Sequence, residues 1–263
     1  MGVSITCYGT RVGIRASDPD ALPALLDRLP PGWQAKPMRT VDRLYSLLVG
    51  GNREGNIRRL NVLYGNAELL ARSRGLDEAL ETFAADVQLH VAEQAARRVF
   101  VHAGVVGWNG RAIVLPGRSF SGKTTLVLEL VRAGATYYSD DYAVFDARGR
   151  VHPFPRQLSI RENGAHVQER HPVEALGGVA GELPLPVGLV AVTEYDAGVA
   201  GWRPRRLSAG HGVLELLGHT VAARRKPEAA LATLERVTGT ALVLKGRRGE
   251  AKRVAARILE RAS

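Results

Sequence analysis

The chain has 263 residues, of which 45% are hydrophobic and 24% charged, a composition typical of a folded globular protein and not of a disordered one. Its formal net charge of +10 favours anionic partners such as nucleotides, phosphates or acidic peptides. The single cysteine, Cys7, excludes an intramolecular disulfide and a cysteine-based zinc site, and no apolar run approaches the roughly 18 residues of a membrane span. We therefore expect a cytoplasmic protein with no membrane partner.

The first third of the chain, residues 1–98, is predicted to form an N-terminal α+β region without a catalytic motif. Apolar alternation predicts two short strands over residues 4–15. The cap and early proline in Ser17-Asp18-Pro19 predict a helix start, and residues 41–63 predict strands. A long amphipathic helix is predicted over residues 77–98. We expect this region to recognise an acceptor or to form a homo-oligomer.

The pattern changes after residue 98. Two apolar strands are predicted over residues 99–106 and 111–115, joined by a hairpin turn at Asn109-Gly110. A helix over residues 123–132 and a strand over residues 135–147 follow. The remaining predicted elements are extended chain at 151–160, a strand at 187–193, helices at 213–217 and 228–237, a strand at 240–244 and a helix at 249–262. This alternation indicates the α/β class for a catalytic region at residues 99–263.

One phosphate-binding motif is complete. Residues 117–124 read Gly-Arg-Ser-Phe-Ser-Gly-Lys-Thr and satisfy G-x-x-x-x-G-K-[ST] between a predicted strand and a predicted helix. Such a loop turns backbone N–H groups toward phosphate oxygens, its lysine reaches the β- and γ-phosphates, and its threonine hydroxyl holds Mg²⁺. The residues expected to bind ATP are Gly117, Ser119, Ser121, Gly122, Lys123, Thr124 and Thr125.

A pair of carboxylates, Asp140 and Asp141, follows the helix after this loop. Phosphoryl transfer to a hydroxyl uses a metal-binding carboxylate and a base. Adjacent residues of a strand point to opposite faces, so these two acids can serve one site only if the strand ends or bends there. The alternative is a solvated strand end. His102 lies in a predicted apolar strand, where a histidine is more often structural than catalytic, and sequence spacing alone does not bring it close to Asp140.

The order of these motifs resembles the catalytic domain of the HPr serine kinase/phosphorylase family. The resemblance covers about residues 99–162, and it is carried by the strand 101–105 (Val-His-Ala-Gly-Val), the phosphate loop, Ser139-Asp140-Asp141 and the segment 158–161 (Leu-Ser-Ile-Arg). Looser similarity extends through residues 187–220. The resemblance implies a P-loop-containing fold of the HPr-kinase/PEP-carboxykinase type.

The same resemblance implies roles for individual residues. Asp140 resembles the base that contacts the acceptor hydroxyl, with His102 hydrogen-bonded near it and Lys123 on the phosphates. Asp141 resembles the second acid, which holds Mg²⁺ with Thr124, and Arg161 resembles a phosphate-contacting arginine. The match does not fix which of the two aspartates is the base.

Two departures from the family pattern narrow the expected activity. Thr125 stands where the bifunctional enzymes usually carry an acid, and residues 160–164 read Ile-Arg-Glu-Asn-Gly in place of Ile-Arg-Gly-Leu-Gly. We therefore expect a kinase without phosphorylase activity. Residues 1–98 do not resemble the family's usual regulatory domain, so HPr itself is not the expected substrate.

The sequence thus predicts an ATP- and Mg²⁺-dependent kinase that acts on a Ser or Thr hydroxyl of a small protein or peptide. A kinase for a free hydroxy amino acid and a nucleotide-dependent switch are the alternatives. The basic clusters at 203–206 and 224–226 could grip an acidic peptide, but we expect most of these charges to be solvated surface. Aromatic residues do not interleave with them, so we expect no nucleic-acid partner.

Overall fold

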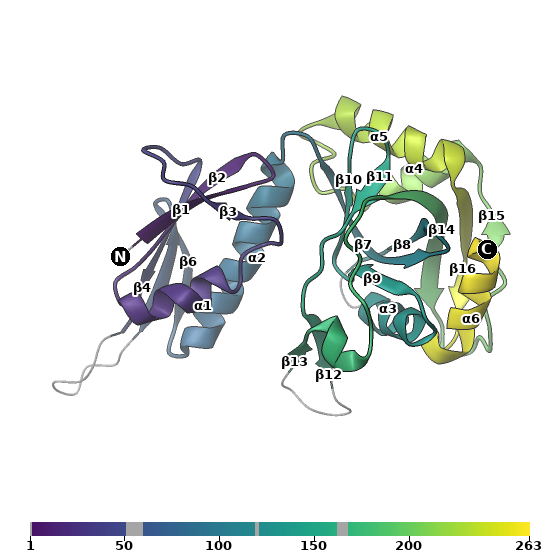
Figure 1. Ribbon diagram of the computed structural model, residues 1–263, viewed down its shortest axis with the longest axis horizontal. Helices are drawn as coiled ribbons and strands as arrows, with labels where there is room; N and C mark the ends of the chain where they lie inside the picture. Colours follow the sequence, from purple (N-terminus) through teal and green to yellow (C-terminus); the bar gives the residue numbers. More distant parts are fainter. Residues whose placement is uncertain (1, 51–59, 119–120, 162–167) are drawn as a thin grey trace. The chain divides into compact units, whose positions relative to one another are not determined.

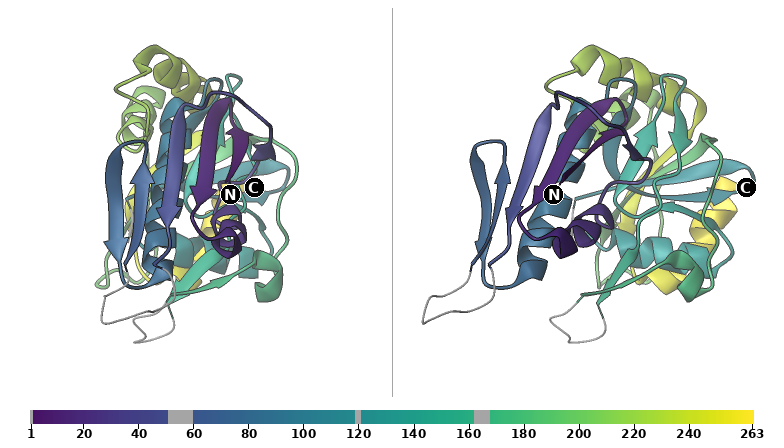
Figure 2. Two further views of the ribbon diagram at one scale, coloured as in Figure 1. Left: turned by 90° about the vertical axis from the view of Figure 1, so that its left-hand side faces the viewer. Right: turned by 60° about the vertical axis from the view of Figure 1, so that its left-hand side comes forward.

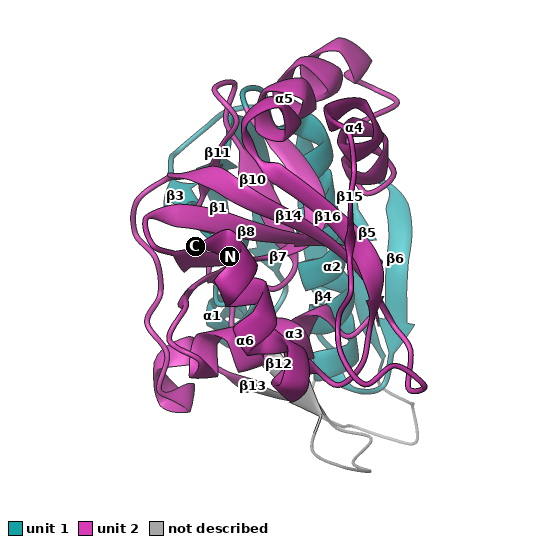
Figure 3. Cartoon of the chain, turned by 90° about the vertical axis from the view of Figure 1, so that its right-hand side faces the viewer, with its two compact units in different colours: residues 1–97 teal, residues 98–263 magenta. Residues whose placement is uncertain are grey.

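The computed structural model describes residues 2–50, 60–118, 121–161 and 168–263 (Figure 1). The chain divides into two compact units, Met1–Arg97 and Arg98–Ser263, which Figure 3 colours separately. The first unit has one sheet and one buried apolar cluster, and the second has a large sheet with two such clusters and a separate two-stranded sheet. Within the described residues, no helix combines the length and the apolar character that a bilayer crossing requires.

The first unit is a mostly antiparallel sheet packed against helices (Figure 2). Its described strands run in the order β3-β1-β2-β4-β5-β6, with β2 and β4 parallel and the other neighbours antiparallel. The elements are β1 Gly2–Cys7, β2 Thr10–Ala16, η1 Pro19–Ala21, α1 Leu22–Leu26, β3 Gln34–Ala35, β4 Arg43–Leu48, β5 Asn61–Gly65, β6 Glu68–Ser73 and α2 Leu76–Gln94.

Helix α2 supplies the apolar face that covers this sheet. Leu80, Phe83 and Val87 recur at helical spacing and are buried, and Phe83 meets Tyr45 of β4 edge to face with ring centres 5.0 Å apart. The predicted strands over residues 4–15 and the long helix are confirmed. Strand β6 has mostly exposed or half-buried side chains, so it lacks the apolar alternation from which a strand could be predicted.

The second unit is a mixed sheet with helices on both faces. Its elements are β7 Val99–Trp108, β8 Arg111–Pro116, α3 Lys123–Arg132, β9 Thr136–Ser139, β10 Tyr142–Phe145, β11 Arg150–His152, β12 Leu158–Arg161, β13 Gln168–His171, η2 Val173–Leu176, β14 Leu185–Tyr195, β15 Arg205–Arg206, α4 Ala209–Leu217, α5 Pro227–Thr240, β16 Leu242–Arg248 and α6 Ala251–Ala262. Helices α3 and α6 pack on one face, and α4 and α5 pack on the other (Figure 3). The α/β class is confirmed.

The strand order of this unit places the phosphate motif at a sheet edge. The path is β11-β10-β7-β8-β14-β16-β15 with β9 also on β7, and β8, β14 and β16 are parallel. Strand β11 also pairs with the start of β14. The carboxyl ends of the three parallel strands lie at the same edge of the sheet, and the phosphate motif follows β8 at that edge. The predicted hairpin is also confirmed, since Asn109 and Gly110 have φ of 48° and 72°, as a two-residue hairpin turn requires.

The single strand predicted over residues 135–147 is wrong. The chain forms two short strands, β9 and β10, which pair with different parts of β7 and are separated by Asp140 and Asp141. The Ser139 hydroxyl oxygen accepts hydrogen bonds from the amides of Asp141 (3.2 Å) and Tyr142 (3.0 Å). This side-chain turn competes with strand pairing and bends the chain, so the strict alternation that separates adjacent carboxylates no longer applies.

Candidate active site

The phosphate motif connects β8 to α3. Strand β8 has a continuous buried run, Ile113-Val114-Leu115, because it lies inside the sheet with helices on both faces. Gly122 has φ 78° and ψ 21° at the start of α3, a left-handed conformation that a side chain disfavours. A side chain at Gly117 would come within 2.8 Å of the Ser121 hydroxyl. The backbone conformation thus favours glycine at 122, whereas a side chain at 117 would displace the Ser121 hydroxyl. Ser119, expected to bind phosphate, lies outside the described residues.

Lys123 reaches back over the loop. Its Nζ donates a 2.6 Å hydrogen bond to the carbonyl oxygen of Arg118. Burial lowers the pKa of Lys123, while Asp141 and Asp140 act in the opposite direction. The ammonium therefore lies across the loop and within electrostatic reach of both carboxylates, where it can turn toward a bound phosphate.

Asp140 contacts the first turn of α3. Thr124 Oγ1 donates a hydrogen bond of 3.0 Å to Asp140 Oδ2, and the Tyr137 hydroxyl donates one of 3.0 Å to Asp140 Oδ1. Burial raises the pKa of Asp140, and the charge of Asp141 adds to this, while the two donors partly offset it. A hydroxyl and a buried carboxylate held 3.0 Å apart form a pair of hard oxygen donors next to the phosphate loop.

Asp141 turns to a different set of partners. Arg156 Nη1 lies 3.1 Å from Asp141 Oδ2, and His102 Nδ1 of β7 lies 4.0 Å from Asp141 Oδ1. Burial lowers the pKa of His102, Lys123 lowers it further and Asp141 opposes them. The His102 imidazole is therefore neutral at neutral pH. The bend at Ser139 thus gives the two adjacent acids different neighbours, one on the loop helix and one on β7.

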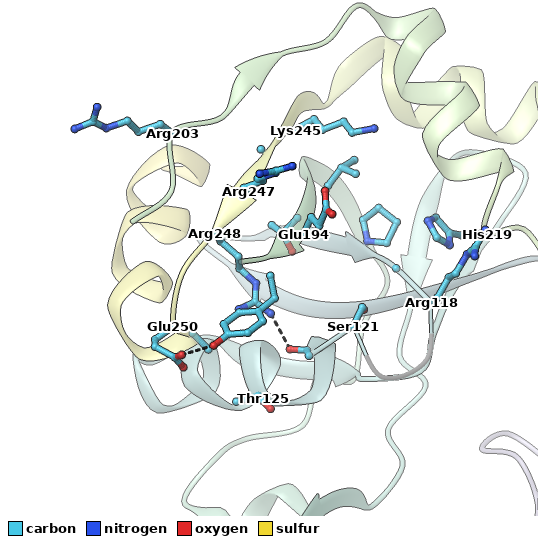
Figure 4. A pocket seen from close by; sticks show the side chains of 18 of the residues that line it. Arg118, Ser121, Thr125, Glu194, Arg203, His219, Lys245, Arg247, Arg248 and Glu250 are labelled. Carbon is cyan, nitrogen blue, oxygen red and sulfur yellow. Dashed lines mark hydrogen bonds between the residues drawn. The ribbon is translucent and has the colours of Figure 1, made fainter. Parts of the chain in front are cut away.

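Two pockets open beside the loop. The larger, about 1220 Å³, lies between the loop and the ends of β14 and β16 and includes Ser121 and Thr125 (Figure 4). The smaller, about 300 Å³, is lined by His102, Arg118, Gly218, His219 and Thr220. The loop therefore has one cavity large enough for a nucleoside and another, next to His102, at the lower end of the volumes of ligand pockets.

His219 is a site residue that the sequence did not identify. The segment after α4 pairs with β7: the His102 amide donates to the His219 carbonyl oxygen at 2.8 Å, and Val101 forms an isolated bridge with Thr220. Burial lowers the pKa of His219, as do the neighbouring Lys123, His102 and Arg118. No motif or spacing in the sequence indicates this pairing.

Arg248 is another such residue. Arg248, in the basic segment 245–253, is only 2% exposed, whereas the sequence predicts that most of the chain's basic side chains are solvated. Its Nη2 donates to the Gly122 carbonyl oxygen and its Nη1 to the Gly249 carbonyl oxygen, each at 3.1 Å. Its guanidinium lies 5.6 Å from the ring centre of Tyr195, and burial lowers its pKa. Arg248 thus ties the end of β16 to the phosphate loop.

The structure brings together most of the residues predicted for the site. Lys123, Thr124, Asp140, Asp141 and His102 converge at the loop. The backbone of Arg161, in β12, pairs with Gln168, and the position of its side chain is not described.

The described oxygens beside the phosphate loop suit a magnesium ion. Among the described residues no group of three or more His, Cys, Asp or Glu side chains could hold a metal. Mg²⁺ in nucleotide sites takes one or two protein oxygens and completes its shell with phosphates and water, so the Thr124–Asp140 pair fits that chemistry.

No protein-family model matches this chain, and a search of curated proteins returns no similar sequence.

Proposed function

We propose that residues 98–263 form a P-loop kinase domain of the HPr-serine-kinase type, which uses ATP and Mg²⁺ to phosphorylate a Ser or Thr hydroxyl on a small protein or peptide. One observation carries the proposal. Two pairs of side chains flank the phosphate loop at the end of β8. On one side the Thr124 hydroxyl donates to the Asp140 carboxylate. On the other side the Asp141 carboxylate lies beside the neutral imidazole of His102.

The loop would bind the phosphates through its backbone amides and the start of α3. Lys123 would leave the Arg118 carbonyl and contact the β- and γ-phosphates. Bound Mg²⁺ would neutralise charge that develops on the phosphate oxygens, and the residues that would hold it are Thr124 and Asp140.

The contacts favour an exchange of the roles implied by the family resemblance. Asp140 already accepts hydrogen bonds from Thr124 and Tyr137, which suits a metal ligand and leaves it poorly placed to receive a proton. Asp141 is 37% exposed and lies near His102, next to the smaller pocket. We assign the base to Asp141 and the metal to Asp140. His102 and Arg156 then position Asp141.

In the resulting step the acceptor oxygen bonds to the γ-phosphorus, and the bond from that phosphorus to the β–γ bridging oxygen breaks. The hydroxyl proton passes to Asp141, and ADP leaves with the bridging oxygen. General-base catalysis of this kind contributes about 10²–10⁴-fold to the rate. The products are a phosphate ester and ADP.

A small-molecule acceptor is the second candidate, and the smaller pocket favours it. Its volume of about 300 Å³ is enough for a serine-sized group, and its wall combines His102 and His219 with the cation of Arg118. A free hydroxy amino acid could offer its hydroxyl to Asp141 and its carboxylate to Arg118.

Incubation with γ-labelled ATP, Mg²⁺ and an extract of the source cells tests the proposal. Acid-stable label on one protein, peptide or metabolite, absent with Asp141→Asn, supports a hydroxyl kinase and identifies the acceptor class. A matched Asp77→Asn variant, at a 93% exposed side chain on α2 of the first unit, should transfer label normally. If nucleotide binds but no label transfers to anything, the kinase assignment fails and a nucleotide-dependent switch becomes the better account.

A further inference from the structure

The larger pocket extends well beyond the phosphate loop. Its volume of about 1220 Å³ exceeds what a triphosphate requires and lies at the upper end of pockets that enclose whole small ligands. The part away from the loop is formed by the end of β14, the end of β16, the start of α6 with the residue before it, and Arg203 and Arg205 at β15. These segments supply Tyr195, Arg248 and Glu250, none of which belongs to a sequence motif. Figure 4 shows Arg248 and Glu250 in the wall of this pocket.

Tyr195 offers an aromatic surface in this part of the pocket. It is the last residue of β14 and remains 47% exposed, which is unusual for a large aromatic side chain and permits contact with a ligand. The Arg248 guanidinium lies over the ring, 5.6 Å from its centre. Because Arg248 is itself buried and hydrogen-bonded to Gly122, the ring is supported by a rigid contact from the loop.

Glu250 adds a hydrogen-bond acceptor at the edge of that ring. Its Oε1 accepts a hydrogen bond of 2.6 Å from the Tyr195 hydroxyl. A carboxylate has two oxygens with about four acceptor positions, so this bond leaves capacity for an N–H donor of a ligand. Glu250 precedes α6 and makes no side-chain cap to that helix, so its carboxylate is not required for the helix start.

Arg248 connects the phosphate loop to the Tyr195 ring. The single guanidinium of Arg248 touches the Gly122 carbonyl at one end and the Tyr195 ring on its face. Phosphates held by the loop and a base stacked on Tyr195 would therefore both lie against groups that this one guanidinium contacts, with the ribose between them.

We propose that Tyr195 and Glu250 form the base subsite of this nucleotide site and select a purine that carries an amino group, with the ring stacked on Tyr195 and the amino group donating to Glu250. The inference rests on the proposed function, because the loop must hold the phosphates. A purine is favoured over a pyrimidine because its larger ring system covers more of the tyrosine face.

Calorimetric titrations of the full chain test this inference with four probes, each with Mg²⁺: ATP, UTP, purine riboside triphosphate (which lacks the amino group) and inorganic tripolyphosphate. We expect the wild type to bind ATP more tightly than the other three. Tyr195→Leu should weaken ATP binding about tenfold or more, the usual loss when a stacked base loses its aromatic partner, and should leave tripolyphosphate binding unchanged. Tyr195→Phe keeps the ring and should stay close to wild type.

Glu250→Ala should remove the preference for ATP over purine riboside triphosphate. The matched control Glu260→Ala, which changes an exposed glutamate of α6, should keep that preference. ATP binding unchanged in both Tyr195→Leu and Glu250→Ala would overturn the base subsite and leave the phosphate loop intact. If the wild type binds neither ATP nor tripolyphosphate, the proposed function itself fails, and the base subsite fails with it.

Discussion

Replacing Gly122 by alanine should destabilise the second unit more than replacing a glycine of similar backbone conformation elsewhere. Gly122 has φ 78° and Gly110, in the β7–β8 turn, has φ 72°, so alanine pays a similar conformational cost at both positions. That cost is roughly 1–2 kcal/mol for a left-handed residue. The surroundings differ: a Cβ at Gly110 meets nothing within 4 Å, whereas a Cβ at Gly122 lies 2.8 Å from Nη2 of Arg248.

The contact with Arg248 determines how much more Gly122→Ala lowers the free energy of unfolding than Gly110→Ala does. The guanidinium must move away from the new methyl group, and its hydrogen bond to the Gly122 carbonyl, 3.1 Å long, then weakens. A hydrogen bond to a charged group contributes about 1.5–3 kcal/mol. We therefore expect Gly110→Ala to lower the free energy of unfolding by about 1–2 kcal/mol. Gly122→Ala should lower it by about 2.5–5 kcal/mol.

Urea unfolding followed by tryptophan fluorescence measures both values, since Trp202 is buried in this unit. In an Arg248→Met background the excess cost of Gly122→Ala should vanish, because the clashing nitrogen is gone. Equal losses for the two glycine variants, or an excess that survives Arg248→Met, would refute the inference that Arg248 braces the loop.

Three further outcomes are expected. Thr124→Val should weaken Mg²⁺-dependent ATP binding, whereas Thr124→Ser should keep it, as measured by calorimetry at fixed Mg²⁺. Equal affinities for the two variants would show that the hydroxyl is not a ligand of the metal. Burial raises the folded-state pKa of Asp140, so its stabilising contribution is complete below the unfolded pKa and is lost as pH rises through the folded pKa. Asp140→Asn should therefore raise the thermal midpoint of the ligand-free protein at pH 7 while reducing transfer, because it removes a ligand of Mg²⁺. A lowered midpoint would contradict this. The pKa of His102 is lowered in the folded state, so its contribution to stability is present above about pH 6.5 and is lost as pH falls through the folded-state pKa. His102→Gln should therefore flatten the decline in thermal midpoint between about pH 7 and 5. An unchanged decline would show that His102 does not contribute to it.

Much of the second unit could be predicted from local sequence. The buried run before the phosphate loop, the glycines within it and the amphipathic helix after it each specify their own conformation. The Asn109-Gly110 hairpin is equally local, and the structure has all of these elements. The α/β class follows from their alternation.

The bend at Asp140 and Asp141 was missed for a specific reason. Residues 135–147 are rich in β-forming side chains, and propensity favours one continuous strand. The hydrogen bonds that the Ser139 hydroxyl accepts from the following amides override that preference. This bend gives Asp140 and Asp141 different partners. Residue spacing in the sequence therefore predicts neither the break between β9 and β10 nor which aspartate binds the metal and which acts as the base.

His219 and Arg248 were missed because their placement depends on long-range pairing. His219 reaches the site only because the chain after α4 pairs with β7, and Arg248 because β16 ends beside the loop helix. A basic cluster in a sequence does not reveal which of its members is buried. Such contacts between distant segments become visible only when the sheet is assembled.

The most direct test measures binding and transfer together. Wild type, Asp141→Asn and Asp140→Asn would each be titrated with Mg·ATP and then followed in a single turnover with γ-labelled ATP and the acceptor found in the extract assay. The account predicts that Asp141→Asn binds Mg·ATP like the wild type but transfers label at least about 10²-fold more slowly, whereas Asp140→Asn loses Mg²⁺-dependent binding as well. Transfer at the wild-type rate by Asp141→Asn, or no nucleotide binding by the wild type, would contradict it.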